Sequence, residues 1–379
     1  MAYIYADNAA TTRLSDAAFD AMKPFMLAEY GNASTLYKLG RSAHKAVENA
    51  RGVFAKGINA LPAEIYFTSG GTESDNWAIK GTAHRLASCG KKHIVTDNIE
   101  HHAVLNSAKA LEREGFEVTY VSADNNGLVR AEDVAAAIRP DTAMVSVMFA
   151  NNELGTIQPV AEIGSICRSA GVLFHCDAVQ AAGILPIDVK QMNIDLLSMS
   201  AHKFHGPKGV GIMYARRGCA PETYIDGGEQ ERGHRAGTEN VAGIVGAASA
   251  FAEAMSERDE KAERLCAMRD EIQSGLLKIP GSQVNGVTAP RLPGTLNMSF
   301  DGIDGQLLIF ELDLKGLAAS SGSACASGSV NPSHVLLALG LPYKLAHGSL
   351  RLSLGKYNTP DEAEMIIRIV SDTVAELRG

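Results

Sequence analysis

Short apolar runs alternate with stretches of helical periodicity between residues 64 and 215, and no other feature limits the fold as strongly. The runs have the length of buried strands: Glu64–Thr68, His93–Thr96, Glu117–Val121, Ala143–Phe149, Val172–Cys176, Ile194–Met199 and Gly209–Tyr214. Helical segments lie between most of them, near 72–89, 101–114, 131–138 and 160–170. Buried strands that alternate with helices form a mainly parallel sheet covered on both faces. We therefore predict an α/β fold with a seven-stranded sheet flanked by helices.

A boundary between two domains is predicted near Glu257. The helical stretch from about 239 to 278 is long for one globular helix, and its composition changes there from small and apolar to highly charged. A chain of 379 residues is also too long for one compact core. Beyond the boundary lie strand candidates at Thr295–Ser299 and Ser349–Ser353 and helix candidates near 304–313 and 360–377. We predict a large domain of residues 14–257 and a smaller α+β domain of residues 1–13 plus 258–379.

The composition excludes several classes of function. The formal charge is −8, from 35 Lys and Arg against 43 Asp and Glu, so a nucleic-acid partner is not expected. No run approaches the roughly 18 apolar residues of a membrane span. The N-terminus MAYIYADNAATTRL lacks the features of a signal peptide, so we expect a cytoplasmic protein. The six cysteines form no CxxC pair and the histidines have no zinc spacing, so we expect free thiols and no built-in metal site.

Polar and reactive residues follow several of the predicted strands. In an open α/β sheet, ligands bind beyond the carboxyl ends of the strands. Ser69-Gly70-Gly71-Thr72 follows one strand and opens a helix, which indicates either a phosphate site or an ordinary tight turn. Asp177, with Gln180 after it, follows the strand ending in LFHC. A carboxylate there needs a cationic or hydrogen-bonding partner, such as a protonated pyridine nitrogen, unless it caps a helix.

Two further strand ends carry nitrogen bases. Lys203 follows the strand that ends near Met199, and it is either a solvated lysine or an amine nucleophile whose pKa is lowered by burial and nearby cations. His101 and His102 open a helix, where a histidine can cap the helix or pack in the core. Taken one at a time, these residues leave both interpretations open.

Cys325 differs in its surroundings from the other five cysteines. It lies in Ser320-Ser321-Gly322-Ser323-Ala324-Cys325-Ala326-Ser327-Gly328-Ser329, a segment with almost no side chain able to anchor a core. Such a segment is expected to be exposed and mobile, and an exposed thiol is prone to oxidation unless it has a function. Cys325 is therefore either a nucleophile that carries a product outward or a cysteine in a flexible linker.

Taken together, the motifs resemble the fold-type-I pyridoxal-phosphate enzymes of the class V aminotransferase group. More narrowly, the chain is similar to the cysteine desulfurases of nitrogenase and general iron–sulfur assembly. The resemblance covers nearly the whole chain and rests on YADNAATT, YGNAST, GGTESDN, EHHAV, NNELGTIQP, HCDAVQ, SAHKFHGPKG, ERGHRAGTEN and SSGSACASG, in that order. It implies a pyridoxal-phosphate-transferase-like large domain and pyridoxal 5'-phosphate as cofactor.

The resemblance also implies catalytic roles. Lys203 would hold the cofactor covalently and later move the Cα proton of the substrate. Asp177 would pair with the pyridinium nitrogen, and His101 would stack on the ring and act as a base and acid. Cys325 would attack the sulfur of L-cysteine as a thiolate and keep it as a persulfide, which would transiently meet an iron–sulfur cluster on a partner.

The remaining implied roles concern binding. Contacts with the cofactor are implied for Gly71, Thr72, Asn152, Gln180, Ser200 and His202. Thr238 would reach the phosphate of the neighbouring subunit, which implies a homodimer. Arg351 would clamp the substrate carboxylate, with Asn152 and Asn32 near the substrate. The sulfur acceptor would be an iron–sulfur scaffold or another thiol carrier.

Three functions follow from these patterns. The first is a cysteine desulfurase that converts L-cysteine to L-alanine. The second is a related selenocysteine lyase or class V aminotransferase; an aminotransferase would not need Cys325. The third is a non-enzymatic protein that binds a metal or cluster, and it lacks a visible group of ligands. The length of the segment around Cys325 favours the first over the selenocysteine enzyme.

Overall fold

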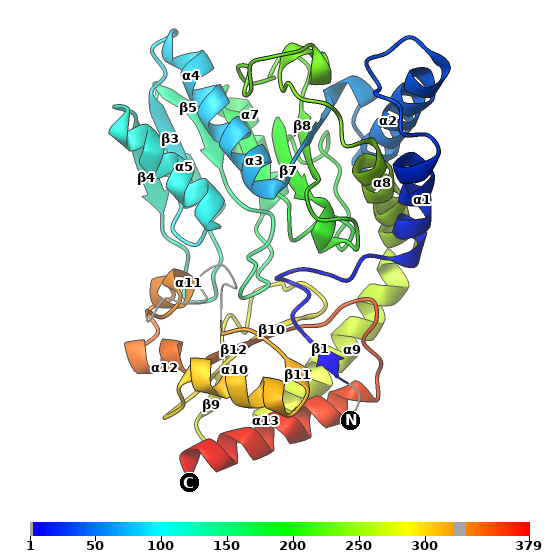
Figure 1. The fold of residues 1–379 in the computed structure, drawn as a ribbon. Helices are drawn as coiled ribbons and strands as arrows, with labels where there is room; N and C mark the ends of the chain where they lie inside the picture. Colours follow the sequence, from blue (N-terminus) through cyan, green and yellow to red (C-terminus); the bar gives the residue numbers. More distant parts are fainter. Residues whose placement is uncertain (1–2, 322–330) are drawn as a thin grey trace.

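The computed structural model describes residues 3–321 and 331–379. A large sheet and its helices lie above a smaller sheet with its own helices in the view of Figure 1. Among the described residues, no helix combines the length and apolar character needed to cross a membrane. Cys325, with the roles predicted for it, lies outside the described residues.

The large sheet contains all seven predicted runs. Its strands are β2 (Ile65–Thr68), β3 (His93–Asp97), β4 (Glu117–Val121), β5 (Thr142–Ser146), β6 (Leu173–Asp177), β7 (Leu196–Ser200) and β8 (Gly211–Ala215). The order is β2-β8-β7-β6-β5-β3-β4, and β8 runs antiparallel to both of its neighbours while the other pairs are parallel. The mainly parallel sheet is therefore confirmed. The run predicted to reach Phe149 ends as a strand at Ser146.

Helices form where the sequence indicates them. They are α3 (Gly71–Asn76), α4 (Thr82–Ala87), α5 (His102–Arg113), α6 (Ala131–Ala137) and α7 (Val160–Ala170). A π-helical turn at Trp77–Gly81 joins α3 to α4, so the segment predicted near 72–89 is helical throughout most of its length.

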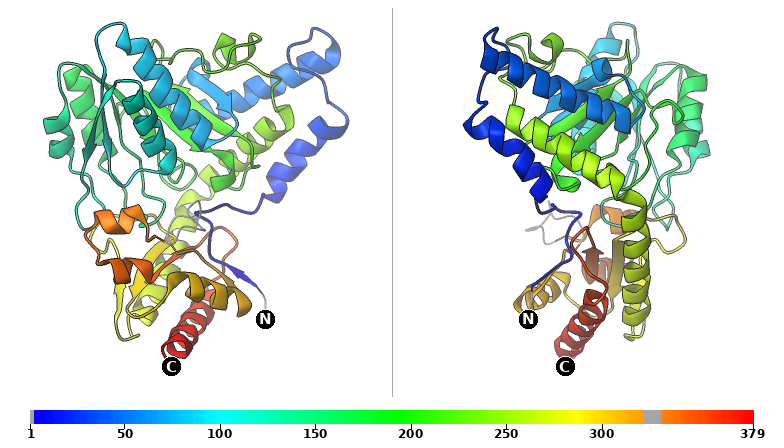
Figure 2. Two further views of the ribbon diagram at one scale, coloured as in Figure 1. Left: turned by 60° about the vertical axis from the view of Figure 1, so that its left-hand side comes forward. Right: turned by 90° about the vertical axis from the view of Figure 1, so that its right-hand side faces the viewer.

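The long helical stretch after residue 239 consists of two helices. They are α8 (Val241–Ser256) and α9 (Arg258–Leu276), and they meet at Glu257, where the composition changes. Two helices that the sequence patterns did not single out, α1 (Asp16–Leu27) and α2 (Lys38–Gly57), pack against α8 at one side of the sheet (Figure 2).

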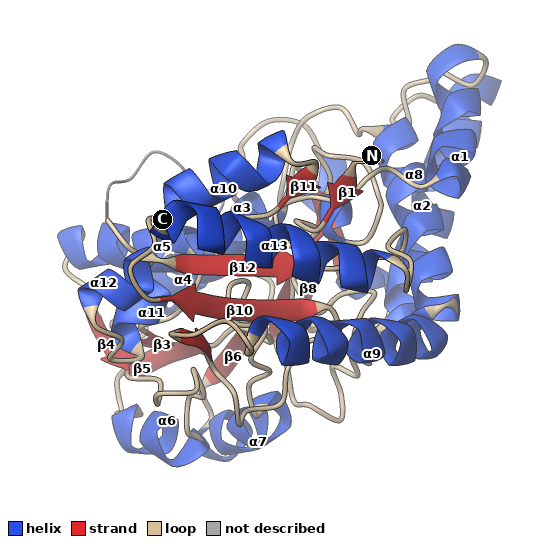
Figure 3. Cartoon of the chain, turned by 90° about the horizontal axis from the view of Figure 1, so that it is seen from below, coloured by secondary structure: helices blue, strands red, loops and turns tan. Residues whose placement is uncertain are grey.

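The smaller unit is an antiparallel sheet covered by helices, seen from below in Figure 3. Its strands are β9 (Ser282–Val284), β10 (Thr295–Phe300) and β12 (Ser349–Ser353), in the order β12-β10-β9, and a separate pair is formed by β1 (Ile4–Tyr5) and β11 (Leu317–Ala318). Its helices are α10 (Gly305–Leu314), α11 (His334–Ala338), α12 (Tyr343–His347) and α13 (Glu362–Arg378). One hydrophobic cluster joins Ile4 to α9, β10, β12 and α13, whereas α11 packs on the core of the large sheet. The division into two domains near Glu257 remains a prediction.

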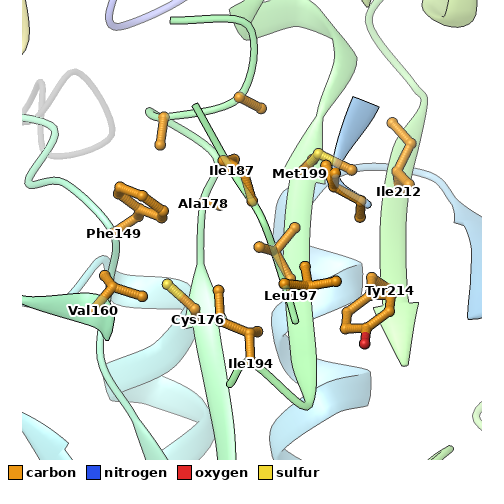
Figure 4. Packing of buried hydrophobic residues seen from close by; sticks show 14 of the residues in the cluster. Phe149, Val160, Cys176, Ala178, Ile187, Ile194, Leu197, Met199, Ile212 and Tyr214 are labelled. Carbon is orange, nitrogen blue, oxygen red and sulfur yellow. The ribbon is translucent and has the colours of Figure 1, made fainter. Parts of the chain in front are cut away.

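The two faces of β6 and β7 have different contents. On one face, Cys176 and Leu197 pack into an apolar cluster with Ile212 (Figure 4). Successive side chains of a strand point to opposite faces of the sheet. His175 and Asp177 belong to the opposite face of β6. Polar side chains are thus gathered on the face toward α3, where β6 and β7 end.

Candidate active site

A cavity of about 170 Å³ opens beyond the ends of β6 and β7. It brings together ten of the predicted site residues: Gly71, Thr72, His101, Asn152, Asp177, Gln180, Ser200, His202, Lys203 and Arg351. The other residues that line it are Ala9, Ala10, Asp75, Met148, Ala150 and Val179. Residues from the N-terminus, the large sheet and β12 therefore converge on one space.

Two predicted site residues do not line this cavity. The Oδ1 atom of Asn32 accepts a hydrogen bond from the backbone N–H of Ser34 at 2.9 Å. Thr238 is exposed, in the segment before α8. Within residues 3–321 and 331–379, no group of three or more His, Cys, Asp or Glu side chains is arranged to hold a metal ion.

Lys203 is held by the N-terminal segment. It ends a short 3₁₀ turn, Ala201–Lys203, directly after β7. Its Nζ donates hydrogen bonds to the carbonyl oxygens of Ala9 at 2.5 Å and Ala10 at 2.8 Å, and Gln180 Nε2 also donates to Ala9 at 3.1 Å. The amine is therefore oriented within the cavity, and it is not a solvated surface lysine. The part played by residues 9 and 10 was not visible in the sequence, because it uses backbone atoms.

Asp177 is a buried carboxyl at the carboxyl end of β6. Burial raises the pKa of Asp177 to about 6, although the hydrogen bond from the Val179 N–H and the charge of Lys203 both favour the ionised form. The bond from Val179 to Oδ1 measures 2.8 Å. Any cation that enters the cavity would therefore stabilise the ionised form of this carboxyl group.

Two histidines in the cavity are kept neutral. Burial, followed by the charge of Lys203, lowers the pKa of His101 to about 4 and that of His202 to about 4. His101 is the N-cap of α5: its Nδ1 accepts the Ala103 N–H at 3.1 Å, which places the ring proton on Nε2. His101 thus caps a helix, which was one of its two predicted roles, and it also lines the cavity.

Arg351 supplies a fixed positive charge from β12. It is 1% exposed, and it donates from Nη2 to Asp7 Oδ1 at 2.7 Å and from Nη1 to the Asn152 carbonyl at 3.0 Å. Its buried Nε has no hydrogen-bond partner among the described residues. Ser320 in turn donates to Asp7 Oδ2 at 2.8 Å. The arginine therefore keeps a donor for an anionic ligand, such as a carboxylate.

The glycine turn before α3 is tightly packed against the end of β6. A Cβ on Gly71 would lie 2.7 Å from Cγ2 of Val179, so only glycine fits there. Thr72 and Ser200 place hydroxyl groups beside this turn in the cavity lining. The first backbone N–H groups of a helix have no intrahelical partner, so this corner suits an anion.

Known proteins match the chain over nearly its full length. The family described as Aminotransferase class-V matches residues 4–366. "Cysteine desulfurase IscS" of Methanosarcina thermophila is 49% identical over 376 residues, covering 99% of this chain and 93% of that protein. "Cysteine desulfurase IscS" of Clostridium botulinum is 49% identical over 378 residues, covering 99% and 95%.

Solved structures agree with this match. A "NIFS-like protein" is similar with a TM-score of 0.93 and 40% identity, covering 99% of this chain and 100% of that one. "SspA in complex with cysteine" is similar with a TM-score of 0.83 and 36% identity, covering 94% and 100%.

Proposed function

The chain belongs to the aminotransferase class-V family and is a pyridoxal-phosphate-dependent cysteine desulfurase, and we propose that it holds the sulfur of free L-cysteine as a persulfide on Cys325. One observation supports the placement of the cofactor and the substrate. A single cavity joins an oriented amine at Lys203, a buried carboxyl at Asp177 and a buried guanidinium at Arg351.

The residues of the cavity fit the cofactor. Gly71, Thr72 and Ser200 line one corner of the cavity, which suits a phosphate, and Asp177 offers a buried anion to a protonated ring nitrogen. Lys203 supplies the amine for covalent attachment, and His101 lies in the lining with a neutral ring. When bound, pyridoxal phosphate supplies an electron sink for the substrate carbon.

The chain's own residues bind and orient the substrate. Arg351 donates to the substrate carboxylate through Nε and a remaining Nη proton, with Asn152 beside it. Lys203 moves the Cα proton, because its Nζ is held at the cavity by the carbonyl oxygens of Ala9 and Ala10. The neutral His101 carries its proton on Nε2, so it can donate that proton or accept one there after losing it.

Sulfur is transferred to the enzyme by a nucleophilic displacement. The Cys325 thiolate attacks the substrate sulfur and forms an S–S bond while the carbon–sulfur bond breaks. The bonding electrons stay with the substrate carbon, which takes up a proton and leaves as L-alanine. The persulfide then passes to a thiol carrier or an iron–sulfur scaffold. Transfer of labelled sulfur to a purified scaffold tests this last step, and absence of transfer to every candidate scaffold counts against it.

We also propose a homodimer with shared sites. Exposed apolar side chains gather on α1 and the segment after it: Phe19, Met26, Leu27, Tyr30 and Leu36. Large exposed apolar patches mark protein–protein contacts, and α1 packs on α8, the helix that follows Thr238. A second copy covering this surface would place Thr238 toward the neighbouring site.

Two variants test the desulfurase assignment at the level of residues. Cys325→Ser is expected to stop formation of L-alanine from L-cysteine while the protein stays yellow with bound cofactor. An aminotransferase would not need Cys325, so full turnover of cysteine to alanine and sulfide by this variant would overturn the proposal. Borohydride is expected to bleach the wild-type colour, and Lys203→Ala is expected to lack it.

A further inference from the structure

Asp75 is a buried carboxyl in the cavity wall to which the mechanism above gives no role. It lies in α3, is 1% exposed and lines the same cavity as Asp177. Its Oδ1 atom has no hydrogen-bond partner among the described residues. Burying an ionised carboxylate without a partner costs free energy, so a buried carboxyl group in this position is expected to have a structural or functional role.

A chain of hydrogen bonds runs from Asp75 into the sheet. The Asp75 carboxyl interacts with Ser198, an interaction that by itself favours the ionised form, and Ser198 lies opposite Asp177 in the pairing of β6 with β7. The Oγ of Ser198 lies 3.1 Å from His175 Nε2, and His175 Nδ1 lies 2.8 Å from the Oγ of Ser146. The Asp75 Oδ1 atom is 3.7 Å from His175 Nε2.

Among the residues that the structure describes, Asp75 has acidic neighbours but no cationic partner. Burial, and then the negative charge of Asp177, raises the pKa of Asp75 well above its usual range, and these two effects outweigh the interaction with Ser198, which lowers it. Burial lowers the pKa of His175 to about 3, so this ring is neutral and gives Asp75 no cationic partner. The buried Glu100 is a further acid near Asp75 and Asp177, whereas the nearby cation, Lys203, acts on Asp177.

We propose that Asp75 is a positioning residue whose neutral carboxyl group donates to Ser198 and so leaves the single negative charge of this wall on Asp177. With that proton in place, Ser198 donates to His175 Nε2 and His175 Nδ1–H donates to Ser146. An ionised Asp75 could only accept, and it would place a second negative charge beside Asp177. The inference deepens the proposed function, because it rests on Asp177 as the partner of the cofactor's ring nitrogen.

Infrared spectroscopy of the apoenzyme tests the protonation directly. The difference spectrum between wild type and Asp75→Asn at pH 8 is expected to contain the carbonyl stretch of one protonated carboxylic acid. The matched control is Asp259→Asn, since this carboxyl is 87% exposed and its difference spectrum should contain only carboxylate bands. A carboxylate band in the Asp75 difference spectrum would overturn the proposal. This readout does not depend on turnover, so it can fail while the proposed function holds.

Cofactor affinity tests the positioning role. Asp75→Asn keeps a neutral donor, so its Kd for pyridoxal phosphate is expected within about threefold of wild type. Asp75→Ala removes the donor and is expected to raise that Kd about tenfold or more, which corresponds to about 1.4 kcal/mol. Equal Kd values for all three proteins would overturn the positioning role. If Asp75→Asn does not fold, Ser198→Ala is the second test: loss of the acceptor should shift the acid carbonyl band, and an unchanged spectrum contradicts the proposal.

Discussion

The sheet wall of the cavity (His101, Asp177 and Lys203) and the β12 wall (Arg351 with Asp7) hold charge in different ways. On the sheet wall, burial lowers the pKa of His101 to about 4 and raises that of Asp177 to about 6, so His101 is a neutral imidazole that can exchange its proton, while the charge of Lys203 favours the ionised form of Asp177. On the β12 wall, the guanidinium of Arg351 is fixed by a salt bridge of 2.7 Å to Asp7. We therefore propose that proton transfer is carried out by the sheet wall and substrate recognition by the β12 wall.

The largest effect is expected on the sheet wall. Lys203→Ala removes both the cofactor's attachment and the group that moves the Cα proton, so alanine production should fall by about 10³-fold. Alanine release is measured with cofactor in excess, and Lys190→Ala, an exposed lysine, is the control. If Lys203→Ala kept activity within tenfold of the control, proton transfer would not belong to this wall.

On the β12 wall, Arg351→Lys should act on binding. The variant keeps a positive charge but loses the paired donors, which corresponds to about 1.5–3 kcal/mol for a hydrogen bond to a charged group, or about 10- to 100-fold. The change should appear mainly in the KM for L-cysteine, with kcat less affected. A fall in kcat at unchanged KM would show that Arg351 acts in the chemical step and not in substrate binding, which would contradict the proposed separation of the two walls.

The pH dependence of folding should come from the sheet wall. The folded-state pKa of His101, about 4, lies below its ordinary value of 6.5, so the unfolded chain binds the proton more readily. This contribution to stability is present above pH 6.5 and is lost as the pH falls toward 4. For apoenzyme, His101→Gln should therefore reduce the loss of unfolding free energy between pH 7 and pH 5 by about 1–2 kcal/mol.

The control for this measurement is His44→Gln, which changes an exposed histidine of α2. Its unfolding free energy should follow the wild-type pH dependence. The prediction is contradicted if His101→Gln and His44→Gln give the same pH dependence.

The smallest effect is expected from Asp7→Asn. The amide keeps an acceptor for Arg351 Nη2 but loses the charge that strengthens this bond, so the KM for L-cysteine should rise about three- to tenfold. Stopped-flow binding or steady-state kinetics would measure it. An effect as large as that of Arg351→Lys would mean that Asp7 does more than orient the arginine.

The sequence predicts the sheet wall better than the β12 wall. Asp177 and Lys203 directly follow buried apolar runs, so strand ends alone place them at one sheet edge. Asp7 was not predicted, because its partner Arg351 lies 344 positions away and only the folded chain joins them. Asp75 was not predicted either, because nothing in its helical segment distinguishes it. Its proposed role depends on Ser198 and His175, which lie on neighbouring strands of the sheet.

The helices show the same limit. The alternation of strands and helices predicts α5 and α7, whereas α1 was missed. This helix contains Pro24 and leaves Phe19 and Leu27 exposed, so it lacks the regular apolar stripe of a helix packed on a sheet. A surface reserved for a second copy would produce such a pattern.

Mass spectrometry after incubation with L-cysteine tests the central claim most directly. The protein should gain the mass of one sulfur atom, and digestion under non-reducing conditions should locate it on the peptide that contains Cys325. The added sulfur should be absent from Lys203→Ala. Sulfur found instead on Cys89, the exposed cysteine among the described residues, or alanine formed with no sulfur on the protein, would contradict the account.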